Sequence, residues 1–283
     1  MPTTYTHYRF GNDCKQLLPE SLETIIDKHR AVFNYGVQGP DIFFYYKCIK
    51  NNEVNRFGND LHYLPFKDTL VNIKENYLRS DHKEEMLAYL LGFTCHFLLD
   101  SECHSFVEAK KEKSGISHLY IESQLDRYYL KKDGKDPLKT YPSATLKYSK
   151  EVALVISECF GKFDEKVTED ALRDMSFYLN VLKDSNDVKR FVLSKMLDAT
   201  GAGHYKDLFL TKYDDPNCAD ANLRLDKHYQ KALTMYAKLA ESLVSYLMLN
   251  KDLDEYFDNH FCQKEDYLDI PVLSLEEEQN YVI

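Results

Sequence analysis

The chain of 283 residues carries 36 lysine and arginine residues against 46 aspartate and glutamate residues, which gives a formal net charge of −10. An acidic chain repels phosphate backbones unless its basic residues gather in one patch. The basic pairs here, such as Lys110-Lys111, are short and interleaved with acids, which argues against nucleic-acid binding as the main function. Hydrophobic residues make up 44% of the chain, enough for a sizeable core.

The N-terminal residues and the cysteines bear on the cellular compartment. Residues 1–6 have neither a basic region nor an apolar run, so the sequence predicts no signal peptide. The most apolar window, residues 87–99, contains His96 and is too short to span a bilayer. Seven cysteines form no Cys-x-x-Cys pair, and an odd number without an export signal is typical of reduced thiols. We therefore expect a cytoplasmic protein with no transmembrane segment.

Helical spacing of apolar residues recurs along most of the chain, and glycine (10) and proline (8) are scarce. Residues 36–62, rich in glycine, asparagine and aromatic residues, are predicted to be loops with short ordered pieces. We predict an all-α fold, a single helical domain of about eight to ten helices over residues 1–250, with an acidic tail, residues 251–283, packing loosely on it. The predicted helices cover residues 14–35, 65–79, 83–109, 117–131, 143–160, 168–183, 185–200 and 222–249.

The most informative motif lies within the apolar segment of residues 83–109. His96, Asp100 and His104 are spaced by four residues, so on a helix they form one polar stripe. The residues around them are largely apolar, and buried imidazole and carboxylate groups need partners, which a metal ion supplies. The alternative is a pair of hydrogen-bonded core histidines beside a capping or ion-paired aspartate.

A second polar stripe follows on the next predicted helix, residues 117–131. His118 and Glu122 lie one turn apart, and Asp126 extends the stripe by another turn. Two adjacent helices would then each offer an inward face of imidazole and carboxylate groups. Helical bundles build sites for two metal ions in this way.

Three further candidate ligands precede these stripes. His7 lies near the start of the chain, Asp41 lies in a Gly-Pro-Asp turn that would hold its carboxylate rigidly, and His62 follows in a short polar segment. Taken alone, each is better explained as structural or solvated. Together the eight candidates offer nitrogen and oxygen ligands without a cysteine, a set that suits zinc. The eight are His7, Asp41, His62, His96, Asp100, His104, His118 and Glu122.

The order of these residues along the chain resembles the ligand order of the zinc-dependent phospholipase C family and of the related P1-type, single-strand-specific nucleases. In both, a histidine, an aspartate and a histidine precede His-x-x-x-Asp, a further histidine and His-x-x-x-Glu. The pattern covers residues 1–126, and the Gly39-Pro40-Asp41 turn strengthens the likeness to bacterial phospholipase C-like proteins. The resemblance implies an all-helical phospholipase C/P1 nuclease-like fold with a cluster of three zinc ions in a cleft.

Carried over by position, the resemblance assigns a role to each candidate. Asp41, His62, His96 and Asp100 would hold one zinc ion, and Asp100 would bridge to a second ion that His7 also binds. The resemblance also makes Asp41 the catalytic candidate, as the group that orients or deprotonates an attacking water.

The third zinc ion would be held by His104, His118 and Glu122. The step from Asp100 to His104 is shorter than in the secreted enzymes, so we expect His104 on the same helix as Asp100. The secreted enzymes also ligate zinc with the mature N-terminus, usually a tryptophan, and this chain has no tryptophan. We therefore expect two or three zinc ions per chain.

The activity implied by the resemblance is hydrolysis of a phosphodiester, foremost a phospholipid headgroup, by a hydroxide that several zinc ions activate. The partner would be a phospholipid or another small phosphodiester. Two alternatives stay open: a non-catalytic helical scaffold that binds metal, and a P1-type nuclease or nucleotidase. A di-iron protein typically needs Glu-x-x-His pairs and an HD-type phosphohydrolase an adjacent His-Asp pair, and the chain has neither.

Overall fold

The computed structural model describes residues 4–183 and 187–283, and these residues form helices and loops without a strand. The all-α class predicted from the sequence is confirmed. The start of the predicted helix over residues 185–200 falls outside the described residues, and so do the first three residues of the chain. The α-helices are α1 (Thr4–Lys15), α2 (Glu20–Lys28), α3 (Arg30–Gly36), α4 (Glu53–Tyr63), α5 (Phe66–Arg79), α6 (Lys83–Ser114), α7 (His118–Lys132), α8 (Lys150–Phe160), α9 (Glu165–Leu182), α10 (Asp187–Ala199), α11 (Ala219–Leu249) and α12 (Leu275–Asn280).

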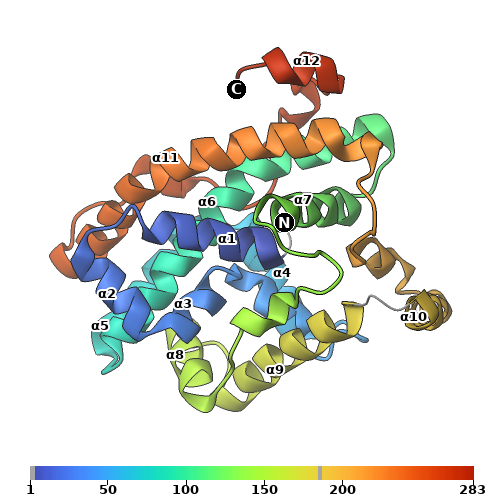
Figure 1. Cartoon of the computed structure of the whole chain (residues 1–283). Coiled ribbons are helices and arrows are strands. Elements are labelled where there is room, and N and C mark those ends of the chain that lie inside the picture. Colours follow the sequence, from blue (N-terminus) through green and yellow to red (C-terminus); the bar gives the residue numbers. More distant parts are fainter. Residues whose placement is uncertain (1–3, 184–186) are drawn as a thin grey trace.

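Helix α6 runs through the middle of the molecule, with α1, α3, α7 and α11 packed around it (Figure 1). Every residue from 86 to 107 is buried, because the apolar side chains of this stretch point in all directions and find neighbours on every side. Glu84 and Glu85 in the first turn stabilise α6, because their negative charges interact favourably with the positive end of the helix dipole. Gly115, with a φ of 72°, ends the helix in the left-handed conformation. The polar residues of α6 therefore lie inside the protein.

The predicted helix over residues 14–35 is in fact parts of three helices. Helix α1 begins earlier than predicted and ends at Lys15, Pro19 precedes α2, and α3 begins after His29. Proline has a fixed φ and no N–H group, so Pro19 cannot continue α1 and serves as the N-cap of α2. Periodicity does not reveal the two breaks, because the apolar spacing continues across both turns.

Residues 36–62 were predicted to be loops with short ordered pieces, and more of this segment is helical than the prediction expects. They contain the 3-10 helix η1 (Gly39–Tyr45) and nearly all of α4. Asn52 caps α4 by accepting two hydrogen bonds from backbone N–H groups at 3.0 and 3.1 Å. The Asn55 side chain donates to two backbone carbonyls of η1 at 2.8 and 3.1 Å and holds η1 against α4. The asparagines that suggested loops are therefore capping and bridging residues.

The segment after residue 250 is anchored more firmly than the loose packing expected of it. Phe257 and Phe261 are fully buried and pack on aromatic rings of α5 and α6. Glu278 of α12 accepts hydrogen bonds from the guanidinium of Arg224 in α11 at 2.7 and 2.9 Å, and both side chains are buried. The acidic composition of the segment hides these anchors, because they are single residues among exposed ones.

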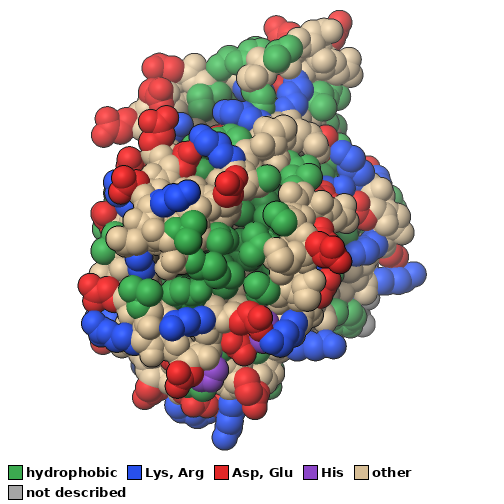
Figure 2. Space-filling model, turned by 90° about the vertical axis from the view of Figure 1, so that its left-hand side faces the viewer, with side chains coloured by type: hydrophobic (Ala, Val, Ile, Leu, Met, Phe, Trp, Pro, Cys, Tyr) green, Lys and Arg blue, Asp and Glu red, His purple; other side chains and the backbone are tan. Residues whose placement is uncertain are grey.

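Hydrophobic side chains gather near the middle of the face that lies on the left of Figure 1, where α2, α5 and the C-terminal end of α11 reach the surface (Figure 2). Exposed hydrophobic residues of these helices include Val71 and Leu78 in α5 and Met248 in α11. Among the described residues, no helix combines the length and the apolar character that crossing a membrane requires. Exposed apolar surface thus occurs as patches on helices that also carry charges.

Candidate metal centre

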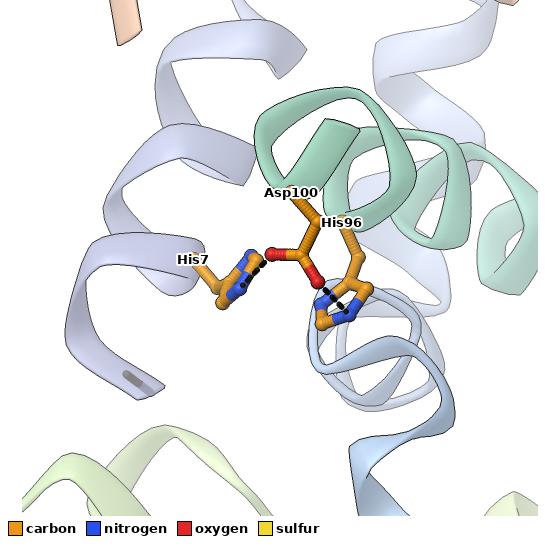
Figure 3. Close-up of side chains that lie close together, drawn as sticks. All are labelled: His7, His96 and Asp100. Carbon is orange, nitrogen blue, oxygen red and sulfur yellow. Dashed lines mark ion pairs between the residues drawn. The ribbon is translucent and has the colours of Figure 1, made fainter. Parts of the chain in front are cut away.

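Asp100 lies between two histidines in the middle of the fold (Figure 3). Asp100 and His96 come from successive turns of α6, and His7 comes from α1. The Nε2 atom of His96 is 3.2 Å from one carboxylate oxygen of Asp100, and the Nε2 atom of His7 is 3.2 Å from the other. The two imidazole rings stack with their centroids 4.1 Å apart. The polar stripe predicted on α6 is thus joined by a histidine from a helix far away in the sequence.

Asp126 of α7 positions the first turn of α1, which carries His7. Its carboxylate accepts hydrogen bonds from the backbone N–H groups of Tyr5 at 3.0 Å and Thr6 at 2.7 Å, and from the Thr6 hydroxyl at 2.6 Å. A carboxylate that accepts from the N–H groups of a first turn stabilises a helix N-terminus. Asp126 therefore extends the polar stripe of α7 as expected. Its hydrogen bonds go to the first turn of α1 and hold that helix in place.

A second group of side chains shares His96 with the first. Asp41 lies in η1, where the turn begins with Gly39-Pro40, and His62 lies near the end of α4. One carboxylate oxygen of Asp41 is 3.1 Å from Nε2 of His62 and 3.9 Å from Nε2 of His96. All three side chains are buried. The contact between η1 and α4 thus carries two of the predicted ligands to the side of α6.

The third group lies one turn further along α6. His104 of α6 faces His118 and Glu122 of α7, and one carboxylate oxygen of Glu122 is 2.7 Å from Nε2 of His118 and 3.8 Å from Nε2 of His104. Ser117 caps α7 by accepting a backbone hydrogen bond, which makes His118 the first residue of the helix. His104 lies on the same helix as Asp100, as the short step between them predicts.

Four of the five histidines are oriented by a hydrogen bond from Nδ1, so that Nε2 faces the carboxylates of the centre. Metal-binding histidines characteristically use their second nitrogen in this way, which fixes the ring and its tautomer. The acceptors are the backbone carbonyls of Gly58 for His62 (2.8 Å), Val37 for His96 (3.3 Å) and Phe261 for His104, and the carboxylate of Glu108 for His118 (2.6 Å). Sequence reasoning missed Glu108 and Phe261, because one is among many glutamates and the other acts through its backbone.

The buried polar atoms of the centre fit a metal ion better than they fit one another. Both ring nitrogens of His7, the Nε2 atom of His96 and both oxygens of Asp100 are buried and form no hydrogen bond within the described residues. Unsatisfied buried polar atoms cost free energy, and zinc takes nitrogen and oxygen ligands of these kinds. Three sets each bring one ligand atom per residue within 4.8 Å of one another: His7, His96 and Asp100; Asp41, His62 and His96; His104, His118 and Glu122.

Burial and charge together set the protonation of the centre. Burial lowers the pKa of His7 from 6.5 to about 4 and that of His118 to about 4, and it lowers the pKa of His104 well below the ordinary value. Burial alone would lower the pKa of His96, but the carboxylates of Asp100 and Asp41 outweigh burial and raise the pKa above its ordinary value. Burial alone would raise the pKa of Asp100, but the neighbouring histidines hold it well below its ordinary value. Neutral imidazole and ionised carboxylate are the forms that bind metal.

The depressed pKa values predict that the metal-free protein is sensitive to acid. His7 and His118 take up protons near pH 6.5 in the unfolded chain but only near pH 4 in the folded protein. The unfolded state therefore binds more protons between these values, and the free energy of unfolding falls as the pH drops from 6.5 to about 4. The loss is about 1.4 kcal/mol for each group and each unit of pKa shift.

Denaturant unfolding of the chelator-treated protein across this pH range measures the loss. His96, whose pKa is raised, contributes a constant stability below pH 6.5 and does not offset it. His118→Gln is expected to reduce the dependence on pH, because one of the three histidines with a lowered pKa is gone. A stability that stays level between pH 6.5 and 4 would contradict the prediction.

Gly39 lies against the ring of His96, and its replacement is expected to disturb the centre. Its φ is +53°, and a Cβ atom there would lie 2.2 Å from Cδ2 of His96. Gly39→Ala is therefore expected to displace His96, to reduce the zinc content and to lower stability by about 2–4 kcal/mol. Gly134→Ala is a matched control, because Gly134 has a φ of +69° and no atom within 4 Å of the added Cβ. Equal zinc content in the two variants would mean that the contact with His96 has no effect on the centre.

The candidate metal centre lies within a segment that matches a known family. A model of the family described as zinc dependent phospholipase C matches residues 6–172. The matched segment contains all eight candidate ligands and all three groups. The chain belongs to the zinc dependent phospholipase C family. No curated protein and no solved structure matches this phospholipase C family member.

The structure of this phospholipase C family member brings all eight residues predicted from the sequence into the three groups. None of the eight lies on the surface away from the centre, although they come from α1, η1, α4, α6 and α7. The part of the chain beyond the matched segment adds the carbonyl of Phe261, which orients His104. The shared His96 links the first two groups, and α6 links them to the third.

Proposed function

We propose that the protein is a zinc-dependent hydrolase of phosphodiesters, foremost of phospholipid headgroups. The observation that supports this most is that three adjoining groups of histidine and carboxylate side chains lie along α6, two of them sharing His96. Membership of the zinc dependent phospholipase C family supports zinc as the metal and a lipid as the substrate. A structural zinc site needs one closed set of four ligands, so a scaffold has no use for three adjoining groups.

In the proposed centre, Asp41, His62 and His96 would hold one zinc ion, and His7 and Asp100, with the shared His96 beside them, would hold a second. The third group holds a further ion, for two or three per chain. Bound zinc supplies Lewis-acid chemistry, polarising phosphoryl oxygens and lowering the pKa of water. Asp41 would accept the proton of the attacking water, and the Gly39-Pro40 turn at the start of η1 would hold its carboxylate in place for this transfer.

The proposal is tested by elemental mass spectrometry of protein purified without chelator, together with an assay on short-chain phosphatidylcholine and on soluble phosphodiesters. Two or three zinc ions per chain and release of phosphocholine are expected, with activity lost on chelation and restored by added zinc. Bound zinc without hydrolysis of any phosphodiester would instead indicate a metal-binding scaffold. Cleavage of single-stranded DNA without cleavage of the lipid would indicate a P1-type nuclease.

A further inference from the structure

Helix α10 has two different faces, and within residues 4–183 and 187–283 it packs on the protein through its inner face. The inner face consists of Arg190, Leu193, Ser194 and Leu197, which are half-buried, and no residue of α10 is fully buried. Arg190 donates a hydrogen bond to the carbonyl of Leu210 at 2.8 Å. The inner face of α10 therefore supplies the contacts that hold this helix to the described part of the protein.

The outer face of α10 is apolar although it is exposed. Val188, Phe191, Val192 and Met196 follow one another at helical spacing and are 73%, 63%, 49% and 59% exposed. A surface helix normally carries polar residues opposite its packed face, because exposed apolar side chains gain nothing from water. Four large apolar side chains on one exposed face mark a surface that binds another apolar phase.

The charges of α10 favour a phospholipid surface with negative charge. The helix has three basic residues (Lys189, Arg190 and Lys195) and two acidic ones (Asp187 and Asp198), a net charge of +1 in a chain whose net charge is −10. Lys195 lies beside the apolar face, with Nζ 5.7 Å from the ring centroid of Phe191. Helices that lie in a membrane interface combine an aromatic and aliphatic face with flanking lysine and arginine. Anionic headgroups attract such lysines.

Helix α10 is connected to the metal centre through the 3-10 helix η3 (Gly203–Leu208), which contacts both α10 and α7 (Figure 1). Asp207 of η3 accepts a hydrogen bond at 2.5 Å from Ser117, the cap of α7, and His118 of the third group is the next residue. A phospholipid surface that binds α10 would therefore lie near α7, the helix that carries His118 and Glu122 of the third group.

We propose that α10 docks this protein on an anionic phospholipid surface by inserting Val188, Phe191, Val192 and Met196 among the lipids. This proposal rests on the function proposed above, because phospholipids are the proposed substrate of the metal centre. Docking through α10 requires no appended membrane-binding domain.

Vesicle sedimentation with the full zinc-loaded chain tests this proposal. Wild-type protein is expected to bind vesicles of phosphatidylcholine and phosphatidylglycerol in equal parts. Phe191→Ser and Met196→Ser are each expected to weaken binding at least about tenfold, which corresponds to about 1.4 kcal/mol, because each removes an apolar side chain that is buried among the lipids. Lys189→Glu and Lys195→Glu are each expected to weaken it at least about fivefold, with a smaller effect on pure phosphatidylcholine.

Val71→Ser and Met248→Ser are the matched controls, because these residues are 45% and 52% exposed on the face formed by α5 and α11. They are expected to leave vesicle binding unchanged. Equal weakening by controls and α10 variants, or no binding by the wild type, would overturn the proposal. A change of oligomeric state in light scattering without a change in vesicle binding would also overturn it, since α10 would then bind a second copy of the chain.

Activity on a soluble phosphodiester separates this proposal from the proposed function. The α10 variants are expected to hydrolyse it at the wild-type rate, because α10 contributes no residue to the metal centre. Vesicle binding without hydrolysis by the wild type would contradict the proposed function and leave the docking surface intact. Hydrolysis without vesicle binding would contradict the docking surface alone.

Discussion

Asp100→Ala is expected to lower the zinc content of the protein by at least one ion per chain and to abolish phosphodiester hydrolysis. The two oxygens of Asp100 face His7 and His96 at 3.2 Å, so the carboxylate joins two histidines from different helices. If a zinc binding free energy of roughly 10–16 kcal/mol is shared by four ligands, the loss of one costs about 3 kcal/mol, or about a hundredfold in affinity. Elemental mass spectrometry and calorimetric titration with zinc measure both effects.

Glu102→Gln is the matched control for Asp100. Glu102 is buried in the same helix two residues further on, but its carboxylate accepts a hydrogen bond from Tyr256 at 2.8 Å and pairs with Lys231 at 2.9 Å. This variant is expected to keep its zinc. Unchanged zinc content in Asp100→Ala would remove Asp100 from the centre. A similar loss in both variants would mean that the measurement reports damage to α6.

Local patterns in the sequence were sufficient for α6, which holds the centre together. Its continuous apolar stretch and its acidic first turn act within the helix, and the predicted start at residue 83 is confirmed, whereas the predicted end at residue 109 is five residues short of Ser114. The breaks after Lys15 and before Arg30 were missed, because they do not change the spacing of apolar residues. Residues 36–62 were misjudged for a different reason: Asn52 and Asn55 occur in loops and in helix caps alike, and only their partners tell the two apart.

In the candidate site, too, local spacing predicts some residues, and tertiary packing decides the position of the others. A spacing of four residues on a helix predicts the stripes of His96 with Asp100 and of His118 with Glu122, because helix geometry alone brings each pair together. No local rule brings His7 to these stripes, since it depends on how α1 packs on α6. Its place, like those of the loop candidates, was expected from the ligand order of a family. The groups that orient the histidines left no pattern at all, because most of the acceptors are backbone carbonyls, two of them supplied by tertiary contacts.

Asp41→Asn is expected to lower the turnover of a soluble phosphodiester by about 10²–10⁴-fold, the contribution typical of a general base. The amide of this variant would retain an oxygen that faces His62, so zinc content is expected to stay near the wild-type value. The variant thus separates the two roles proposed for this residue, because an amide can still ligate a metal but cannot accept a proton. Turnover at saturating substrate and elemental analysis of the same preparation measure the two effects together.

Asp60→Asn is the matched control for Asp41, because Asp60 lies on α4 two residues before His62 and its side chain is exposed. It makes the same chemical change close to the centre and is expected to leave turnover unaltered. Loss of zinc from Asp41→Asn in proportion to its loss of activity would mean that Asp41 acts as a ligand only. Wild-type turnover in Asp41→Asn would show that another group accepts the proton of the attacking water, and the buried carboxylate of Asp41 would then serve the histidines beside it.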